Sequence, residues 1–520
     1  MRPGTRELLR ESSVRVASVS VILFFLASCA STAIQQSSLL SLNESGWGDS
    51  YVLYDVLHFQ KTGTIYRDLS RPPYLAAQYS PLVYILYSIP GRVFRFSNAF
   101  LAPRVVALTA FLSCVLLVAS IVRALIPVRF VGLWAVAMAG SIGTMRDWPL
   151  QLRGDFPGIF FDLLAMRLLF IPSGWAVIGA GFCAGFATQF KFTFVAGLLA
   201  GGLWLLLRRR WRSAVIFAGG GIVAAVGIYV LFWVHEHRML QQILALSPGI
   251  PDLHGLRRQI LQTAGEPVVL LAMLGISQVL LRIVSRWGLL VLFAASSFCI
   301  ATLTDLQAGG NVNYFFETLF TAVPFAVLGA KRLMSWARQR AGPAEFVTVL
   351  FTVHLLVPQL ASLDYMLKSN HPSTLQARDR RFRSLEDVLI GRHIFSTVPR
   401  IALLDRDPAL MEPYLQSYLE RLGKFDFGPL RRRLGAQEFD VVVTSAYAES
   451  WRGVPGIASD LRMAIIATYE PYCVYTPYLV QYLVHLPVGS GLHDAKLQAA
   501  LTRIGCQPVT CNSSPVCQAW

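Results

Sequence analysis

Acidic side chains gather in the polar segment that separates the first two apolar stretches of the chain. This segment carries Asp49, Asp55 and Asp68. An acid held where a membrane meets water is costly to place, and an ionised carboxylate there can accept a proton from a sugar or lipid hydroxyl as a general base. Asp49, which directly follows Trp47-Gly48, is the main candidate, and its alternative is a solvated loop acid or a helix cap. We expect Asp55 and Asp68 to be solvated loop acids or helix caps.

A second polar segment covers residues 146–157 and holds one acid and two arginines of interest. Asp155 comes just before Pro157, a position that suits the first turn of a helix, where an acid caps the helix and is favoured by its dipole. Its functional alternatives are a second catalytic acid or a ligand of a divalent metal ion. Arg146 and Arg153 could hold a phosphate, because the guanidinium fork matches phosphate oxygens. The alternative for both arginines is an ordinary anchor at the membrane interface.

Two charged side chains interrupt later apolar stretches. Lys191 lies between Phe190 and Phe192 at the turn of an expected hairpin. It either extends to water along its own aliphatic stem or offers a cation to a lipid-linked phosphate. Glu317 lies about one turn inside the stretch that opens after Asn313, and a carboxylate inside a membrane span needs a partner or a task. A pair with Lys191 or with an arginine would make Glu317 structural.

The elements that position these groups are apolar stretches. Apolar residues make up 54% of the chain and charged residues 15%, which excludes an ordinary soluble protein. The expected spans are 16–34, 80–96, 103–122, 129–145, 157–171, 174–190, 192–207, 213–234, 267–284, 287–304, 314–330 and 344–362. Residues 1–362 are therefore predicted to form an all-α polytopic membrane module with about 11–13 transmembrane helices.

Basic residues account for the net charge of +16 and cluster beside the ends of apolar stretches. The clusters lie near the N-terminus and at 208–212, 282–286 and 331–340. This positive-inside pattern places these clusters in the cytoplasm and places the Asp49 loop, the Lys191 turn and everything after residue 362 outside. Counting spans from the N-terminus puts 146–156 inside instead, so one segment among the second to fourth spans must be re-entrant or split. The placement of the charge argues against a nucleic-acid partner.

The first apolar stretch has two interpretations. Leu26-Ala27-Ser28-Cys29 fits a bacterial lipoprotein cleavage site, in which case the stretch would be removed. We expect a retained transmembrane anchor, because cleavage would deprive the Asp49 loop of its neighbouring span.

Residues 378–520 are predicted to form a small extracytoplasmic α/β domain, joined to the membrane module by a polar linker at 363–377. Apolar runs rich in β-branched residues predict strands near 400–404, 439–444 and 472–486, with helices near 413–423 and 460–467. The domain contains Cys473, Cys506, Cys511 and Cys517. An oxidising compartment favours disulfides among them, with three possible connectivities, over metal binding.

Together these residues resemble the GT-C superfamily of membrane glycosyltransferases, of the bacterial kind similar to protein mannosyltransferases and to the aminoarabinose transferases that act on lipid A. The resemblance covers about residues 14–362. It is carried by Asp49, Gly63…Ile65-Tyr66-Arg67-Asp68, Tyr79-Ser80-Pro81-Leu82-Val83-Tyr84, Arg153-Gly154-Asp155-Phe156-Pro157, Phe190-Lys191-Phe192-Thr193 and Asn313-Tyr314-Phe315-Phe316-Glu317.

The resemblance implies a polyprenyl-phosphate sugar as donor and transfer with inversion to an extracytoplasmic glycan, lipid or protein, in the bacterial inner membrane. It implies that Asp49 is the general base and that Asp155 is a second acid that positions the acceptor or a metal ion. The substrate-binding residues expected from it are Lys191, Arg153, Arg146, Tyr79, Asn313 and Glu317. Two alternatives are a transporter or flippase for a polyisoprenoid-linked glycan and a non-enzymatic envelope assembly factor.

Overall fold

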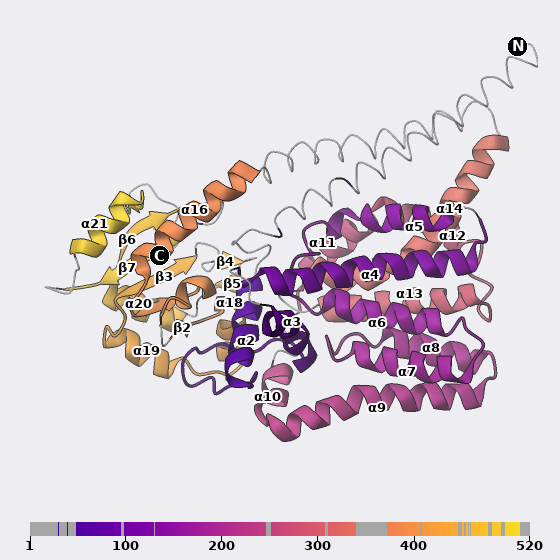
Figure 1. Ribbon diagram of the computed structural model, residues 1–520, viewed down its shortest axis with the longest axis horizontal. Coiled ribbons are helices and arrows are strands. Elements are labelled where there is room, and N and C mark those ends of the chain that lie inside the picture. The colour runs from indigo at the N-terminus through magenta and orange to yellow at the C-terminus, as the bar shows by residue number, and fades with distance from the viewer. Residues whose placement is uncertain are drawn as a thin grey trace, which may run out of the picture.

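The computed structural model describes most of the chain as a helical bundle followed by a mixed α/β domain (Figure 1). The described residues are 30, 39, 48–94, 98–128, 130–245, 251–306, 310–339, 372–405, 408–445, 450–451, 454–455, 457, 459–476, 481–489 and 495–509. This arrangement confirms the expected fold class. The expected span at 344–362 lies outside the described residues. So does the expected span at 16–34, including Cys29, apart from residue 30.

Most of the bundle helices overlap the expected apolar stretches, and three, at 49–62, 238–245 and 253–264, lie in the segments between them. They are α2 (Asp49–Thr62), α3 (Pro81–Val93), α4 (Leu101–Leu125), α5 (Val131–Gly140), α6 (Asp155–Leu168), α7 (Gly174–Ala187), α8 (Ala196–Leu207), α9 (Trp211–His235), α10 (Arg238–Ala245), α11 (Leu253–Ala264), α12 (Pro267–Ile276), α13 (Arg286–Asp305) and α14 (Phe316–Gln339), with short 3-10 turns η2 (Gly143–Met145) and η3 (Val312–Phe315). In lipid every backbone polar group must be satisfied within the segment, so long apolar runs become helices.

Several of these helices are long and apolar enough to cross a membrane. Among the described residues four pass by length and composition, Leu101–Leu125, Trp211–His235, Arg286–Asp305 and Val312–Leu333, and a fifth is counted if α11 and α12, bent by 74°, form one span. Three shorter apolar helices, α5, α7 and α8, lie alongside them. The chain is therefore an integral, multi-pass membrane protein.

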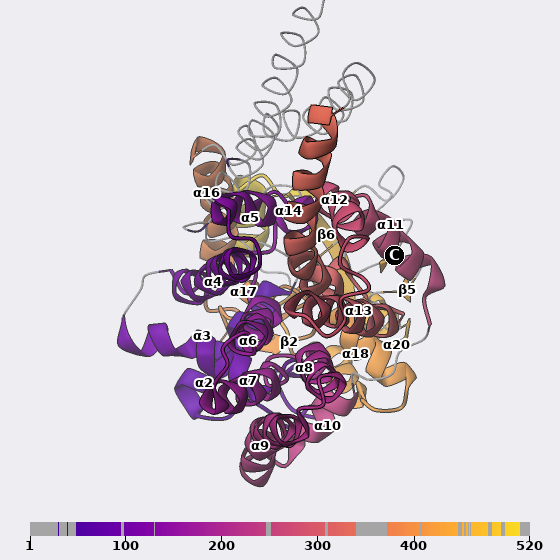
Figure 2. The same cartoon turned by 90° about the vertical axis from the view of Figure 1, so that its right-hand side faces the viewer.

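Helix α3 differs from the other expected spans in its direction. Figure 2 looks along the bundle and shows α4, α6, α7 and α9 end-on, whereas α2 and α3 are seen from the side. Helix α3 has 13 residues and contains Pro90, and at 1.5 Å per residue it reaches only about 20 Å. It lies beside α2 at the end of the bundle that faces the mixed domain (Figure 1).

The C-terminal domain is built on a six-stranded sheet with the strand order β2-β1-β3-β7-β6-β8. Its strands are β1 (Ile394–Ser396), β2 (Ala409–Leu410), β3 (Val441–Ser445), β6 (Tyr469–Tyr475), β7 (Tyr482–Pro487) and β8 (Gln507–Pro508), and a separate hairpin joins β4 (Ser450–Trp451) to β5 (Val454–Pro455). β1 pairs in parallel with β2 and β3, and the other pairs are antiparallel. The helices are α16 (Pro372–Leu389), α17 (Pro399–Ala402), α18 (Pro413–Arg421), α19 (Gly428–Gly435), α20 (Ser459–Thr468) and α21 (Ala495–Arg503).

Most of the elements expected in this domain are present, but one expected strand is wrong. Residues 400–404 begin in α17 and continue as a turn, while the strand of that region is β1, a few residues earlier. Pro399 explains the difference, because its fixed φ suits the first position of a helix and it has no N–H for a strand ladder. Helix α16 begins at Pro372, inside the segment expected to be a linker.

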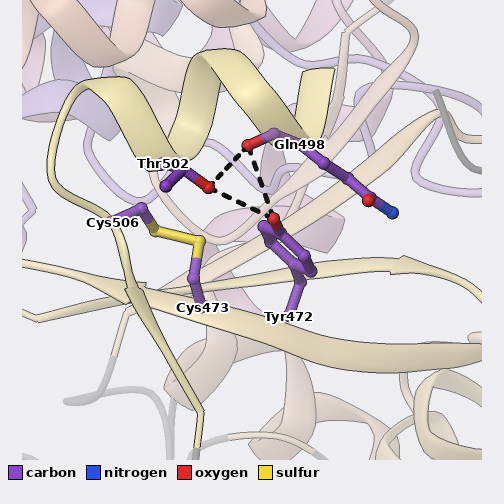
Figure 3. Close-up of a disulfide and its surroundings, with 5 residues drawn as sticks. All are labelled: Tyr472, Cys473, Gln498, Thr502 and Cys506. Atoms are coloured by element: carbon purple, nitrogen blue, oxygen red, sulfur yellow. Dashed lines mark hydrogen bonds between the residues drawn. A yellow bond between two sulfur atoms is a disulfide. The ribbon is translucent and has the colours of Figure 1, made fainter. Parts of the chain in front are cut away.

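A disulfide joins Cys473 on β6 to Cys506, which follows α21 (Figure 3). The same corner is closed by Tyr472, whose hydroxyl lies 3.4 Å from both the Gln498 carbonyl and the Thr502 hydroxyl. Disulfides persist in oxidising compartments, so the bond agrees with the predicted extracytoplasmic location. Cys511 and Cys517 lie outside the described residues.

Replacing Cys473 and Cys506 by serine should lower the stability of this domain by about 3–4 kcal/mol, because the bond closes a loop with a sequence separation of 33 residues. The measurement is the thermal midpoint of the domain, followed by resistance to proteolysis with and without reductant. The control is Cys183→Ser in α7, which should leave the midpoint unchanged. A midpoint that changes neither with the two serine substitutions nor with reductant would contradict the prediction.

His485 on β7 should make the stability of the domain depend on pH. Its side chain is buried, and burial lowers its pKa from 6.5 to about 3. Between these values the unfolded chain binds a proton that the folded chain excludes, so the free energy of unfolding should fall as pH falls from about 6.5 toward 3, by at most about 1.4 kcal/mol per pH unit. His485→Gln should flatten this slope in thermal unfolding, while His254→Gln on the exposed face of α11 should keep it.

Candidate active site

The N-terminus of α2 positions Asp49. Gly48 has a φ of 93°, in the left-handed region that favours glycine, and the helix begins at the next residue. The Asp49 side chain is buried, and its Oδ1 accepts a hydrogen bond from the backbone N–H of Leu152 at 3.1 Å. The carboxylate therefore lies against the second polar loop, at a helix end that favours negative charge.

Asp155 is likewise the first residue of its helix, α6, and it receives two side chains from distant segments. Lys191 Nζ donates to Asp155 Oδ1 at 3.2 Å, and Asn313 Nδ2 donates to the same oxygen at 3.0 Å. The second oxygen, Oδ2, is buried and has no hydrogen-bond partner within the described part of the chain. Asp155 thus keeps an acceptor for a further donor while both of its partners are fixed.

Close packing brings these segments together. A Cβ placed on Gly154 would lie 2.5 Å from the carbonyl oxygen of Phe190, so only glycine lets the loop approach the Lys191 turn this closely. On the other side, the rings of Phe156 and Phe316 are stacked with centroids 5.8 Å apart, which holds α6 against α14. Glycine and aromatic contacts therefore set the distances from Asp155 to its partners.

Lys191, the partner of Asp155, brings a cation to the site. Its Nζ lies 3.6 Å from the centroid of the Tyr314 ring, a cation–π contact. Burial alone would lower the pKa of Lys191, but the Asp155 carboxylate and the Tyr314 and Tyr79 phenols together raise it above its ordinary value. The ammonium is therefore charged at neutral pH. Tyr314 was not among the expected site residues, although its position next to Asn313 could have indicated it.

Arg153 is a second cation near Asp49 and Asp155. Its guanidinium lies over the Trp148 ring at 4.8 Å, and its Nε donates to Gln151 Oε1 at 3.0 Å. It is hydrogen-bonded to the Tyr79 phenol and interacts electrostatically with Asp155 and Asp49. Burial raises the pKa of Tyr79, so this phenol is a neutral hydrogen-bonding group.

Two expected site residues are engaged elsewhere. Arg146 interacts with Asp147 and Glu266, beside the η2 turn. Glu317 lies against Asp162 of α6, so the suggested pair with Lys191 or with an arginine is wrong. Lys191 instead pairs with Asp155.

The two remaining acids of the first loop differ from each other. Asp55 is buried on α2 and pairs with Arg67, so the expectation of a solvated acid or cap is wrong for it. Burial raises the pKa of Asp55 to about 7 although Arg67 opposes the shift. Asp68 agrees better with the expectation: its side chain is 36% exposed, and it pairs with Arg238 at 3.0 Å.

Two side chains beyond α9 anchor the first loop and were not anticipated. The Glu236 carboxylate accepts hydrogen bonds from the backbone N–H groups of Ile65 and Tyr66, the latter at 2.6 Å. Gln242 donates to the Arg67 carbonyl at 2.7 Å and accepts from the Ala77 N–H at 2.9 Å. Glu236 follows the end of an apolar stretch, so the criterion that selected Asp49 would also have found it.

The cluster therefore joins Asp49, Asp155, Lys191, Arg153, Tyr79 and Asn313. It combines carboxylates able to accept a proton with cations able to hold an anion. A divalent ion could use Asp49 or Asp155, but no group of three or more His, Cys, Asp and Glu side chains able to hold a metal occurs in the described ranges.

The fold as a whole is similar to that of solved structures of ArnT and of an archaeal oligosaccharyltransferase. Among solved structures, the chain is similar to ArnT from Cupriavidus metallidurans in the apo state, with 13% identity and a TM-score of 0.59 over 92% of this chain and 99% of that one. ArnT bound to undecaprenyl phosphate gives 13% identity and a TM-score of 0.52 over 91% and 99%. The apo oligosaccharyltransferase of Archaeoglobus fulgidus gives 11% and 0.50 over 90% and 74%. No protein-family model matches the sequence, and no curated protein does either.

Proposed function

We propose that this protein is a membrane glycosyltransferase that moves a sugar from a polyprenyl-phosphate donor to an extracytoplasmic acceptor. The observation that carries the proposal is the arrangement of Asp49 and Asp155 around Arg153, with Lys191 paired to Asp155, at one end of a GT-C-like bundle. The undecaprenyl phosphate bound to ArnT, a structure of the same fold, supports the class of donor.

In this proposal Asp49 is the general base. Its carboxylate accepts the proton of an acceptor hydroxyl as the oxygen forms a bond to the anomeric carbon of the donor sugar. The bond between that carbon and the phosphate oxygen breaks on the opposite face, so the configuration inverts and the lipid phosphate leaves. Lys191 and Arg153 compensate the charge of the leaving phosphate, and Asp155 orients Lys191.

The site is proposed to face the extracytoplasmic side. Helix α3 lies across the bundle (Figure 2), and if it does not cross the membrane, the conflict in the span count disappears. With the two terminal apolar stretches, α4–α9 and α12–α14 then give an odd number of crossings. The loops of Asp155 and Lys191 then lie on the same side of the membrane as the C-terminal domain, and the basic clusters lie on the opposite side.

The test is an in-vitro transfer assay. Purified protein in nanodiscs would be given a panel of radiolabelled polyprenyl-phosphate sugars, with native membrane extract as the acceptor. We expect label from at least one donor to enter the extract. Folded protein that transfers label from no donor, yet moves a labelled polyprenyl-linked glycan across vesicle membranes, would overturn the proposal in favour of a flippase.

A further inference from the structure

The carboxyl edge of the parallel strands in the C-terminal domain is filled by the membrane module. Thr397 follows β1 and Met411 follows β2, both at this edge. In open α/β sheets this edge is where ligands usually bind. Here the hydroxyl of Tyr51, in the first turn of α2, donates to the Thr397 carbonyl at 2.6 Å and lies 3.4 Å from the Met411 carbonyl.

The first loop also enters the apolar core of the domain. Leu75, Tyr51 and Tyr54 form one buried cluster with Ala402 and Leu410 of the domain. Tyr74 and Ala76 are buried within a larger cluster, whose other fully buried members come from the domain. The Leu410 N–H donates to the Pro73 carbonyl at 3.0 Å, so the loop continues the hydrogen bonding of the β2 edge.

These contacts fix α2 from one side, while the bundle fixes the loop from the other. Glu236 and Gln242 hold the backbone of the loop near Tyr66 and Ala77. The domain holds the first turn of α2 through Tyr51, which is 3% exposed. Asp49 belongs to the same helical turn, so its distance from the Leu152 N–H depends on where this turn is held.

We infer that the C-terminal domain is a clamp for the catalytic loop and that Tyr51 is a positioning residue for Asp49. The inference rests on the proposed transferase function. At this edge of the sheet the domain binds the chain's own first loop, and the Tyr51 hydroxyl contacts the Thr397 and Met411 carbonyls there.

The test is Tyr51→Phe in the full-length protein, which removes the hydroxyl and keeps the buried ring. Loss of one buried hydrogen bond should lower kcat about tenfold, because the base is less well placed. The KM for the donor should stay within about twofold, since Lys191 and Asn313 are held by Asp155. The control is Tyr472→Phe, which deletes a hydroxyl beside the disulfide within the domain (Figure 3) and should leave both constants unchanged.

Hydrogen exchange gives a readout that does not require activity. In Tyr51→Phe, amides in the first two turns of α2 should exchange at least fivefold faster, while those of β6 and β7 keep wild-type rates. Equal kcat for Tyr51→Phe and wild type, or faster exchange throughout the domain, would overturn the clamp. A wild type that transfers no sugar would overturn the proposed function, and the exchange pattern would still decide about the clamp.

Discussion

Asp49→Asn is expected to reduce sugar transfer by about 10²–10⁴-fold while the protein folds normally, the range found for removal of a positioned general base. The amide has nearly the shape of the carboxylate, so its oxygen can still accept the Leu152 N–H bond. It cannot take the acceptor proton. The measurement is kcat in the transfer assay, with the KM for the donor expected to change little because Lys191 and Arg153 are untouched.

Asp68→Asn is the matched control for this prediction. Asp68 lies in the same loop, but it is partly exposed and pairs with Arg238, so its amide should retain wild-type kcat. Asp155→Asn provides a further comparison, because it should weaken the hold on Lys191 and raise the donor KM. Transfer by Asp49→Asn at more than a tenth of the wild-type rate would remove Asp49 as the base and direct attention to Asp155.

The helices and the principal acids could be predicted from the sequence because both follow from the cost of polarity at a membrane. Apolar runs must satisfy their own backbone hydrogen bonds, so α4 and α13 lie within a few residues of their expected spans. The same cost singles out Asp49 and Asp155, which are indeed buried at helix starts.

What could not be predicted depends on partners that are distant in sequence. The partner considered for Glu317 was a cation, but the packing of α14 on α6 sets it against Asp162. Asp55 looks like a loop acid until the fold places Arg67 beside it in a buried site. Helix α3 has the composition of a span, yet it has only 13 residues and lies beside α2, and neither feature can be seen in the sequence pattern.

Short strands in the C-terminal domain could not be predicted from the sequence either. Strands β1 and β2 have three and two residues, too few for a periodic pattern, and their pairing becomes visible only in the sheet. The role of the domain is equally invisible in its own sequence. It emerges from Tyr51 and Leu75, which belong to the membrane module.

Lys191→Met should raise the KM for the donor by about 10- to 100-fold, the loss expected for a charge-assisted hydrogen bond to phosphate of about 1.5–3 kcal/mol. The side chains of Lys191 and Asp155 are 12% and 2% exposed, so water screens their charges little. Removing the ammonium also leaves the Asp155 carboxylate to repel the phosphate. The measurement is the donor KM, supported by direct binding of undecaprenyl phosphate.

A double variant separates phosphate binding from simple neutralisation of Asp155. If Lys191 only balances that carboxylate, Lys191→Met combined with Asp155→Asn should recover the wild-type affinity for undecaprenyl phosphate. If Lys191 binds the phosphate, the double variant should recover only the part of the affinity that repulsion by Asp155 removes, and it should stay clearly weaker than wild type. Lys191→Arg should also recover part of the affinity, because it restores the charge. Lys61→Met at the exposed end of α2 is the control and should bind as wild type does. Full recovery in the double variant would therefore assign Lys191 a structural role and leave Arg153 as the phosphate ligand.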